Sequence, residues 1–174
     1  MLAPVLVFAI GNESRGDDAL GPMLLRELDA WLTAKDLAAG FELMEEFQLQ
    51  VEHTLDMKDR KLVLLIDAGT NTPAPFSFYR ATAGNEPVLY SHALSPEALL
   101  QVARRLHGTI PDTFVLCIRG ETFELGEAPT SRALNNLAAA LTFSRQLMSA
   151  PHAELWNRAV SQNKMSPEEP VWTS

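Results

Sequence analysis

Two adjacent carboxylates, Asp17 and Asp18, stand where a short apolar segment gives way to an amphipathic one. Residues 5–10 are apolar and rich in β-branched side chains, which predicts a buried parallel strand. After the carboxylates, apolar residues recur at helical spacing: Leu20, Leu24, Leu25, Leu28, Trp31 and Leu32. Junctions between a strand and a helix are where α/β proteins bind ligands, and carboxylates there can bind a divalent cation or transfer a proton.

A simpler interpretation of the two carboxylates is helix capping, because a carboxylate accepts hydrogen bonds from free amides and suits the helix dipole. The preceding loop argues for more than a cap, since Gly11, Asn12 and Gly16 permit unusual backbone angles that a cap does not need. The glycine spacing fits neither a dinucleotide fingerprint nor a P-loop, and no Gly-Lys-Ser/Thr follows. Acidic side chains would also repel a phosphate.

Two further candidates lie beyond predicted strands. Asp67 directly follows the apolar residues 62–66, so it could meet Asp18 where neighbouring parallel strands end, although an aspartate that only caps the loop is the alternative. His92 lies in a loop before the helix start Ser95-Pro96, and a lone loop histidine is more often a solvated or packing residue. Two carboxylates and one imidazole suit a borderline divalent ion with open coordination positions.

The segment 5–22 resembles the opening signature of the hydrogenase maturation endopeptidases. That signature runs from a first strand into Gly-Asn, a short loop, and an acidic pair followed by Ala, an aliphatic residue and Gly. The resemblance implies that Asp18, where the family more often has Glu, is a nickel ligand. It likewise implies Asp67 as the second ligand and His92 as the third, and it spans residues 3–148 in element order.

The resemblance implies a nickel-dependent endopeptidase that removes the C-terminal extension of a nickel-iron hydrogenase large-subunit precursor after nickel insertion. Nickel would be presented by the substrate, and Asp18 or Asp17 would act catalytically by accepting a proton from water. No serine, cysteine or lysine stands in an arrangement typical of a nucleophile. The alternative is a non-enzymatic checkpoint or chaperone, which would bind the nickel-loaded subunit through the same ligands and leave cleavage to another factor.

Another histidine, His53, lies in the segment 48–56, which also resembles part of this family. It does not fall at the predicted end of a core strand, so we interpret it as a supporting residue or a contact to the partner. His107 closes a predicted helix and His152 lies near the C-terminus, which makes both weaker candidates.

The remaining pattern predicts an α/β fold with three layers. All-apolar segments such as 62–66 are typical of strands covered on both faces by helices. We therefore expect a twisted, mostly parallel sheet of about five strands with helices on both of its faces. The predicted strands are 5–10, 41–47, 61–66, 76–80 and 114–118, with a short helical turn at 52–59 and helices from 20, 96 and 130 onward.

Length and composition set further limits. With 174 residues, 47% of them hydrophobic, we expect one catalytic domain over 1–150 and a partly mobile tail over 151–174. A formal net charge of -8 argues against nucleic-acid and membrane partners and leaves a protein partner or a metal. The single cysteine, Cys117, excludes an internal disulfide, which favours the cytoplasm, and we expect it to be a buried strand residue. A monomer that binds its partner transiently fits a cleft at one sheet edge.

Overall fold

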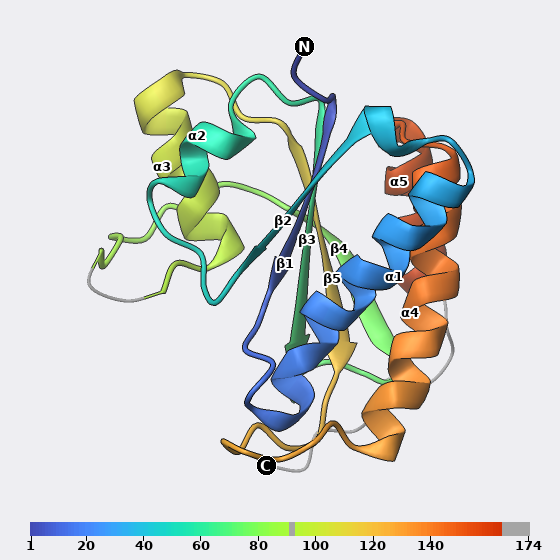
Figure 1. The fold of residues 1–174 in the computed structure, drawn as a ribbon. Coiled ribbons are helices and arrows are strands. Elements are labelled where there is room, and N and C mark those ends of the chain that lie inside the picture. The colour runs from blue at the N-terminus through green and yellow to red at the C-terminus, as the bar shows by residue number, and fades with distance from the viewer. Residues whose placement is uncertain (91–92, 165–174) are drawn as a thin grey trace.

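The structure is a computed structural model that describes residues 1–90 and 93–164. Within these residues the chain forms a five-stranded sheet in the order β2-β1-β3-β5-β4 (Figure 1). The first four strands in this order are parallel, and β4 runs antiparallel at the edge. This arrangement confirms the expected mostly parallel sheet. The strands are β1 (Val5–Ile10), β2 (Phe41–Glu46), β3 (Leu62–Gly69), β4 (Phe76–Ala81) and β5 (Asp112–Arg119).

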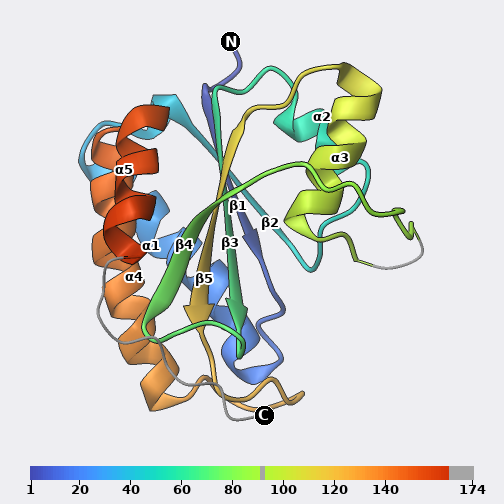
Figure 2. The same cartoon turned by 180° about the vertical axis from the view of Figure 1, so that it is seen from behind.

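Helices cover both faces of the sheet, which confirms the three layers (Figures 1 and 2). One face carries α1 (Leu20–Ala34), α4 (Ser131–Ser149) and α5 (Ala153–Lys164), and the other carries α2 (His53–Met57) and α3 (Pro96–His107). Two 3-10 helices lead into α1 and β2: η1 (Gly16–Ala19) and η2 (Ala38–Gly40). In both views α2 and α3 lie toward the amino ends of the parallel strands, so helices leave the carboxyl-end part of that face uncovered.

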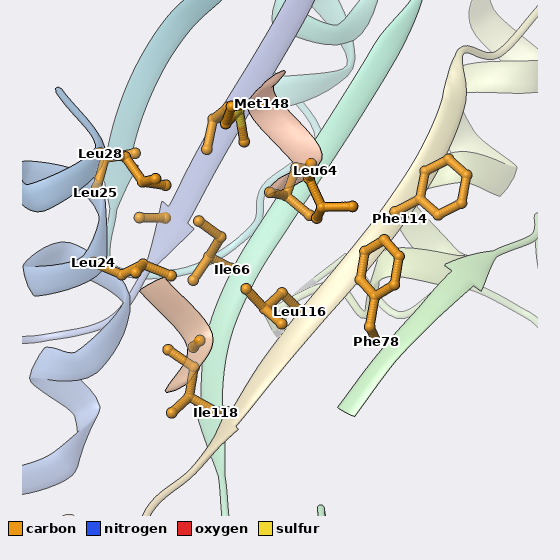
Figure 3. Packing of buried hydrophobic residues seen from close by; sticks show 14 of the residues in the cluster. Leu24, Leu25, Leu28, Leu64, Ile66, Phe78, Phe114, Leu116, Ile118 and Met148 are labelled. Atoms are coloured by element: carbon orange, nitrogen blue, oxygen red, sulfur yellow. The ribbon is translucent and has the colours of Figure 1, made fainter. Parts of the chain in front are cut away.

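Alternation along the strands divides the core into two clusters. The larger cluster packs sheet residues such as Leu64 and Leu116 against Leu24 of α1 (Figure 3). The smaller cluster places Phe8 and Leu65 on the opposite face, with α2 and α3. Every residue of β1 is buried, as expected for an interior strand between two helical layers.

The chain beyond residue 150 differs from the expected tail. Residues 153–164 form α5, whose Trp156 is fully buried with its ring 5.4 Å from that of Phe114. The Nε1–H of Trp156 donates to the carbonyl of Leu147 at 3.0 Å. Trp156 and Val160 are one helical turn apart, so this mostly polar segment still buries an apolar stripe. Residues 153–164 therefore belong to the packed domain, whereas residues 165–174 of the expected tail lie outside the described residues.

Candidate functional site

A pocket of about 600 Å³ lies at the carboxyl ends of the parallel strands, on the sheet face that also carries α3. Its floor comes from β3, β4 and β5, and its walls come from the loops after β2 and β5 and the start of α3. Asp18 and Asp67 both line it, so two of the predicted metal ligands reach one cavity. Its main lining residues are Ile10, Asp18, Phe47, Gln48, Leu49, Leu65, Asp67, Thr72, Ser77, Tyr79, Ala93, Leu94, Val115, Cys117 and Phe123.

Asp18 owes its position to the glycine-containing loop before it. Its Oδ2 accepts the N–H of Asn12 at 2.7 Å, which ties the side chain back to that loop. A Cβ on Gly11 would lie 2.0 Å from the carbonyl oxygen of Asp18, so only glycine allows this close approach. Burial raises the pKa of Asp18, although the Asn12 hydrogen bond and the charge of Arg15 oppose the rise. The loop thus delivers a partly desolvated carboxylate to the pocket.

Asp67 lies inside β3, because the strand continues to Gly69 beyond the predicted end. Its Oδ1 accepts the N–H of Ala68 at 2.8 Å. Burial raises the pKa of Asp67 to about 6, and the negative charge of Asp18 adds to that rise against the effect of the Ala68 hydrogen bond. The two carboxylates therefore repel each other across one space, and a bound cation would relieve that repulsion.

His92, the third predicted ligand, lies outside the described residues. Ala93 and Leu94, which follow it in the sequence, line the pocket. Among residues 1–90 and 93–164, no three side chains of His, Cys, Asp or Glu are placed to hold a metal ion. The described part of the site thus offers two carboxylates to a cation.

Asp17 faces away from the pocket lining and binds the loop after β5. It is fully buried, and its oxygens accept the amides of Glu121 at 2.7 Å, Thr122 at 3.2 Å and Thr130 at 2.7 Å, and the Thr130 hydroxyl at 2.9 Å. Burial alone would raise the pKa of Asp17, but these hydrogen bonds outweigh it and lower the pKa. With both oxygens engaged, Asp17 connects η1 to the loop that carries Phe123.

Neither aspartate caps a helix within the described chain, so the capping interpretation is wrong for both. The residue before α1 is Ala19, and no side chain accepts a hydrogen bond there. The predicted helix starts elsewhere are confirmed: Ser95 Oγ accepts the N–H of Ala98 at 3.1 Å, and Thr130 Oγ1 accepts that of Ala133 at 3.2 Å.

The sequence analysis did not place two polar side chains, Cys117 and Tyr79, in the pocket floor. Cys117 lies in β5 as expected, but it is half-buried and not fully buried. Cys117 pairs in register with Asp67, and burial together with the Asp67 charge raises the pKa of its thiol to about 11, so it is protonated at neutral pH. Burial, together with the carboxylate of Glu97, raises the pKa of Tyr79 to about 12. The strand register was the missing information, because alternation places Cys117 and Tyr79 on the face of Leu65 once the pairing is known.

Comparisons with known proteins point to one fold. No protein-family model and no curated protein matches this sequence. Among solved structures, the [NiFe] hydrogenase maturation protease HycI from Thermococcus kodakarensis KOD1 is 16% identical, with a TM-score of 0.64 over 84% of this chain and 93% of that one. The hydrogenase maturating endopeptidase HybD from E. coli is 22% identical, with a TM-score of 0.62 over the same shares. At such identities the likeness shows the fold, and it agrees with the resemblance of the 5–22 segment.

Proposed function

We propose that this chain, which has the fold of the [NiFe] hydrogenase maturation proteases, is a nickel-dependent endopeptidase. Its substrate would be the precursor of a nickel-iron hydrogenase large subunit, from which it removes a C-terminal extension after nickel insertion. The observation that carries the proposal is the meeting of Asp18 and Asp67 in one pocket at the carboxyl edge of this fold. Carboxylates at that edge serve ligand binding, whereas the interior of the sheet serves stability.

Different roles are assigned to the residues of the pocket, some in binding the cation and some in cleaving the peptide. Asp18 and Asp67 would hold a nickel ion that arrives with the substrate, with His92 as the third ligand that the sequence resemblance implies. A nickel ion bound there supplies a Lewis acid next to the scissile peptide. Asp18, whose pKa burial raises, would take the proton of the attacking water as general base.

Asp17 has a different part in this proposal. Its four hydrogen bonds hold the loop after β5, so we assign it the positioning of Asp18 and of the Phe123 wall, and we give the proton transfer to Asp18. Cys117 lines the floor, where burial and the Asp67 charge raise the pKa of its thiol to about 11, so we assign the role of nucleophile to water.

A set of isosteric variants tests the proposal. Asp18→Asn and Asp67→Asn each keep the shape of the side chain and remove its charge, and Asp29→Asn makes the same change on an exposed residue of α1. We expect each pocket variant to slow cleavage of a nickel-loaded precursor by roughly 100-fold or more, because a lost ligand or base costs about that much. Asp29→Asn should cleave like the wild type. Intact-mass spectrometry measures the cleavage rate. A cleavage rate of Asp18→Asn equal to that of the wild type would contradict the proposal.

A further inference from the structure

One wall of the pocket is a short loop, residues 47–50, between β2 and α2. It belongs to no strand or helix, so the packing of Leu49 in the smaller core cluster and hydrogen bonds to other segments hold its conformation. Just before it, the carbonyl of Glu46 accepts the N–H of Gly11 at 3.0 Å, and within it the carbonyl of Leu49 accepts the N–H of Leu94 at 3.1 Å. The wall is thus tied to the Asp18 loop on one side and to the segment before α3 on the other.

His53 supplies the remaining tie, at the far end of this wall. The residue is only 5% exposed, and its Nδ1 accepts the N–H of Gln50 at 2.8 Å. In return, the N–H of His53 donates to the carbonyl of Gln50 at 3.0 Å. The ring packs edge-on against Phe8, with ring centroids 4.7 Å apart. The His53 side chain therefore binds the N–H of Gln50, and the backbone N–H of His53 binds the carbonyl of Gln50. The packing of the ring against Phe8 fixes the position of His53.

The hydrogen bond also defines the state of the imidazole. An Nδ1 that accepts an amide proton carries none itself, so the neutral ring has its proton on Nε2. Nε2 lies 4.0 Å from Glu46 Oε1, which is too far for a direct hydrogen bond. A leucine would fill the same space against Phe8, so packing alone does not require a histidine at this position. The property that a leucine lacks is the hydrogen-bond acceptor at Nδ1.

We infer that His53 is a positioning residue, whose Nδ1 holds the 47–50 wall in the shape that seats the substrate. Its effect on catalysis rests on the function proposed above, whereas its effect on the wall does not. Phe47, Gln48 and Leu49 line the pocket from this wall, so a displaced wall changes substrate contacts without touching Asp18 or Asp67. The expected signature is weaker substrate binding with the chemical step preserved.

Three substitutions distinguish the effect of the hydrogen-bond acceptor at Nδ1 from the effects of the polarity and the volume of the side chain. His53→Asn keeps an oxygen close to the place of Nδ1, His53→Gln moves the polar group out to the place of Nε2, and His53→Leu removes it. In the full chain, hydrogen exchange of the Gln50 amide and the KM and kcat for nickel-loaded precursor are measured. We expect His53→Leu and His53→Gln to raise exchange and KM about tenfold with kcat within about twofold, the effect of one hydrogen bond. His53→Asn should restore both values to within about threefold of wild type.

Two results would overturn the inference. One is a His53→Leu variant whose Gln50 amide exchange rate and KM equal those of the wild type. The other is an equal rise of the exchange rate and of KM in His53→Asn and His53→Leu, which would mean that the ring serves packing alone. If the wild type cleaves no precursor, the proposed function fails, and the exchange comparison among the three variants alone decides whether His53 holds the wall.

Discussion

The partly buried carboxylate of Asp67 in β3 lowers the free energy of unfolding when it is ionised. Its pKa of about 6 in the folded protein is above the ordinary carboxyl value of 3.8, so folding favours the protonated form. Stability therefore falls as the pH rises from about 4 to about 6, and above that range the ionised group costs about 3 kcal/mol. We predict that Asp67→Asn raises the free energy of unfolding by that amount at pH 7.5 and much less at pH 4, measured by urea denaturation. An equal effect at both pH values would contradict this cause.

Asp17 has the opposite character. The hydrogen bonds from Glu121, Thr122 and Thr130 lower its pKa, so it stabilises the fold above the ordinary carboxyl pKa and ceases to do so as the pH falls through its own lower value. In Asp17→Asn, an amide NH₂ would meet these donors. We predict a loss of about 2–4 kcal/mol in the free energy of unfolding at pH 7.5. Asp18→Asn, the neighbouring control, should change it by less than about 1 kcal/mol, because Asp18 makes one such bond. An Asp17→Asn chain as stable as wild type would refute the role.

Local sequence pattern was sufficient to predict that Asp18 and Asp67 meet, because each follows a recognisable apolar strand. It could not predict the role of Asp17, whose partners Glu121 and Thr130 lie 104 and 113 residues away. A buried carboxylate that joins two loops and one that faces a pocket have the same local context. Only the fold distinguishes them, since it decides which of two adjacent side chains points inward.

At the scale of elements, α5 shows how a polar segment becomes part of the core. Trp156 is fully buried between the sheet and α4, whereas its neighbour Leu155 is 40% exposed. We predict that Trp156→Ala lowers the free energy of unfolding by about 3–5 kcal/mol through the cavity that it leaves. Leu155→Ala, on the same helix, should lower it by less than about 1 kcal/mol. Equal effects in urea denaturation would contradict the packing of α5.

The strands were predictable because their periodicity is simple. Residues 5–10 form β1 as predicted, and β3 begins within one residue of its predicted start. The prolines at 73 and 75 predicted that 76–80 lies near a sheet edge, and β4 is the edge strand. The full strand order and the antiparallel direction of β4 beside β5 were not predictable from periodicity. Helix α5 was missed because two apolar residues one turn apart are a weak signal in a polar sequence.

Across the whole molecule, charge is concentrated at the edge that carries the pocket. The segments that begin at the carboxyl ends of β1, β2, β3 and β5 are residues 11–19, 45–52, 67–75 and 119–130, and their formal charge of -8 equals that of the entire chain. Arg26 of α1 pairs with two of their carboxylates, Glu13 and Glu45. Within residues 1–90 and 93–164, none of the helices has the length and hydrophobicity of a membrane span. The segments contain two cations, Arg15 and Arg119, and ten carboxylates: Glu13, Asp17, Asp18, Glu45, Glu46, Glu52, Asp67, Glu121, Glu124 and Glu127.

This polarity predicts electrostatic steering of a partner that is basic around its cleavage site. The rate of association between this protein and a nickel-loaded precursor should fall about tenfold or more as salt rises from roughly 0.05 to 0.5 M, because screening shortens the reach of the acidic edge. Stopped-flow or surface binding at several salt concentrations measures it. Reversing the charge of the exposed Glu124 and Glu127 should slow association at low salt and leave the high-salt rate unchanged. A salt-independent rate would contradict steering.

The proposed protease activity is tested by the intact mass of a hydrogenase large-subunit precursor, with and without nickel, after incubation with this protein. The proposed function predicts a mass loss equal to a C-terminal peptide in the nickel-loaded sample alone. A stable complex with the nickel-loaded precursor and no mass loss would contradict it and indicate a checkpoint that binds the subunit without cleaving it. Cleavage of both samples would contradict the proposal that cleavage depends on nickel.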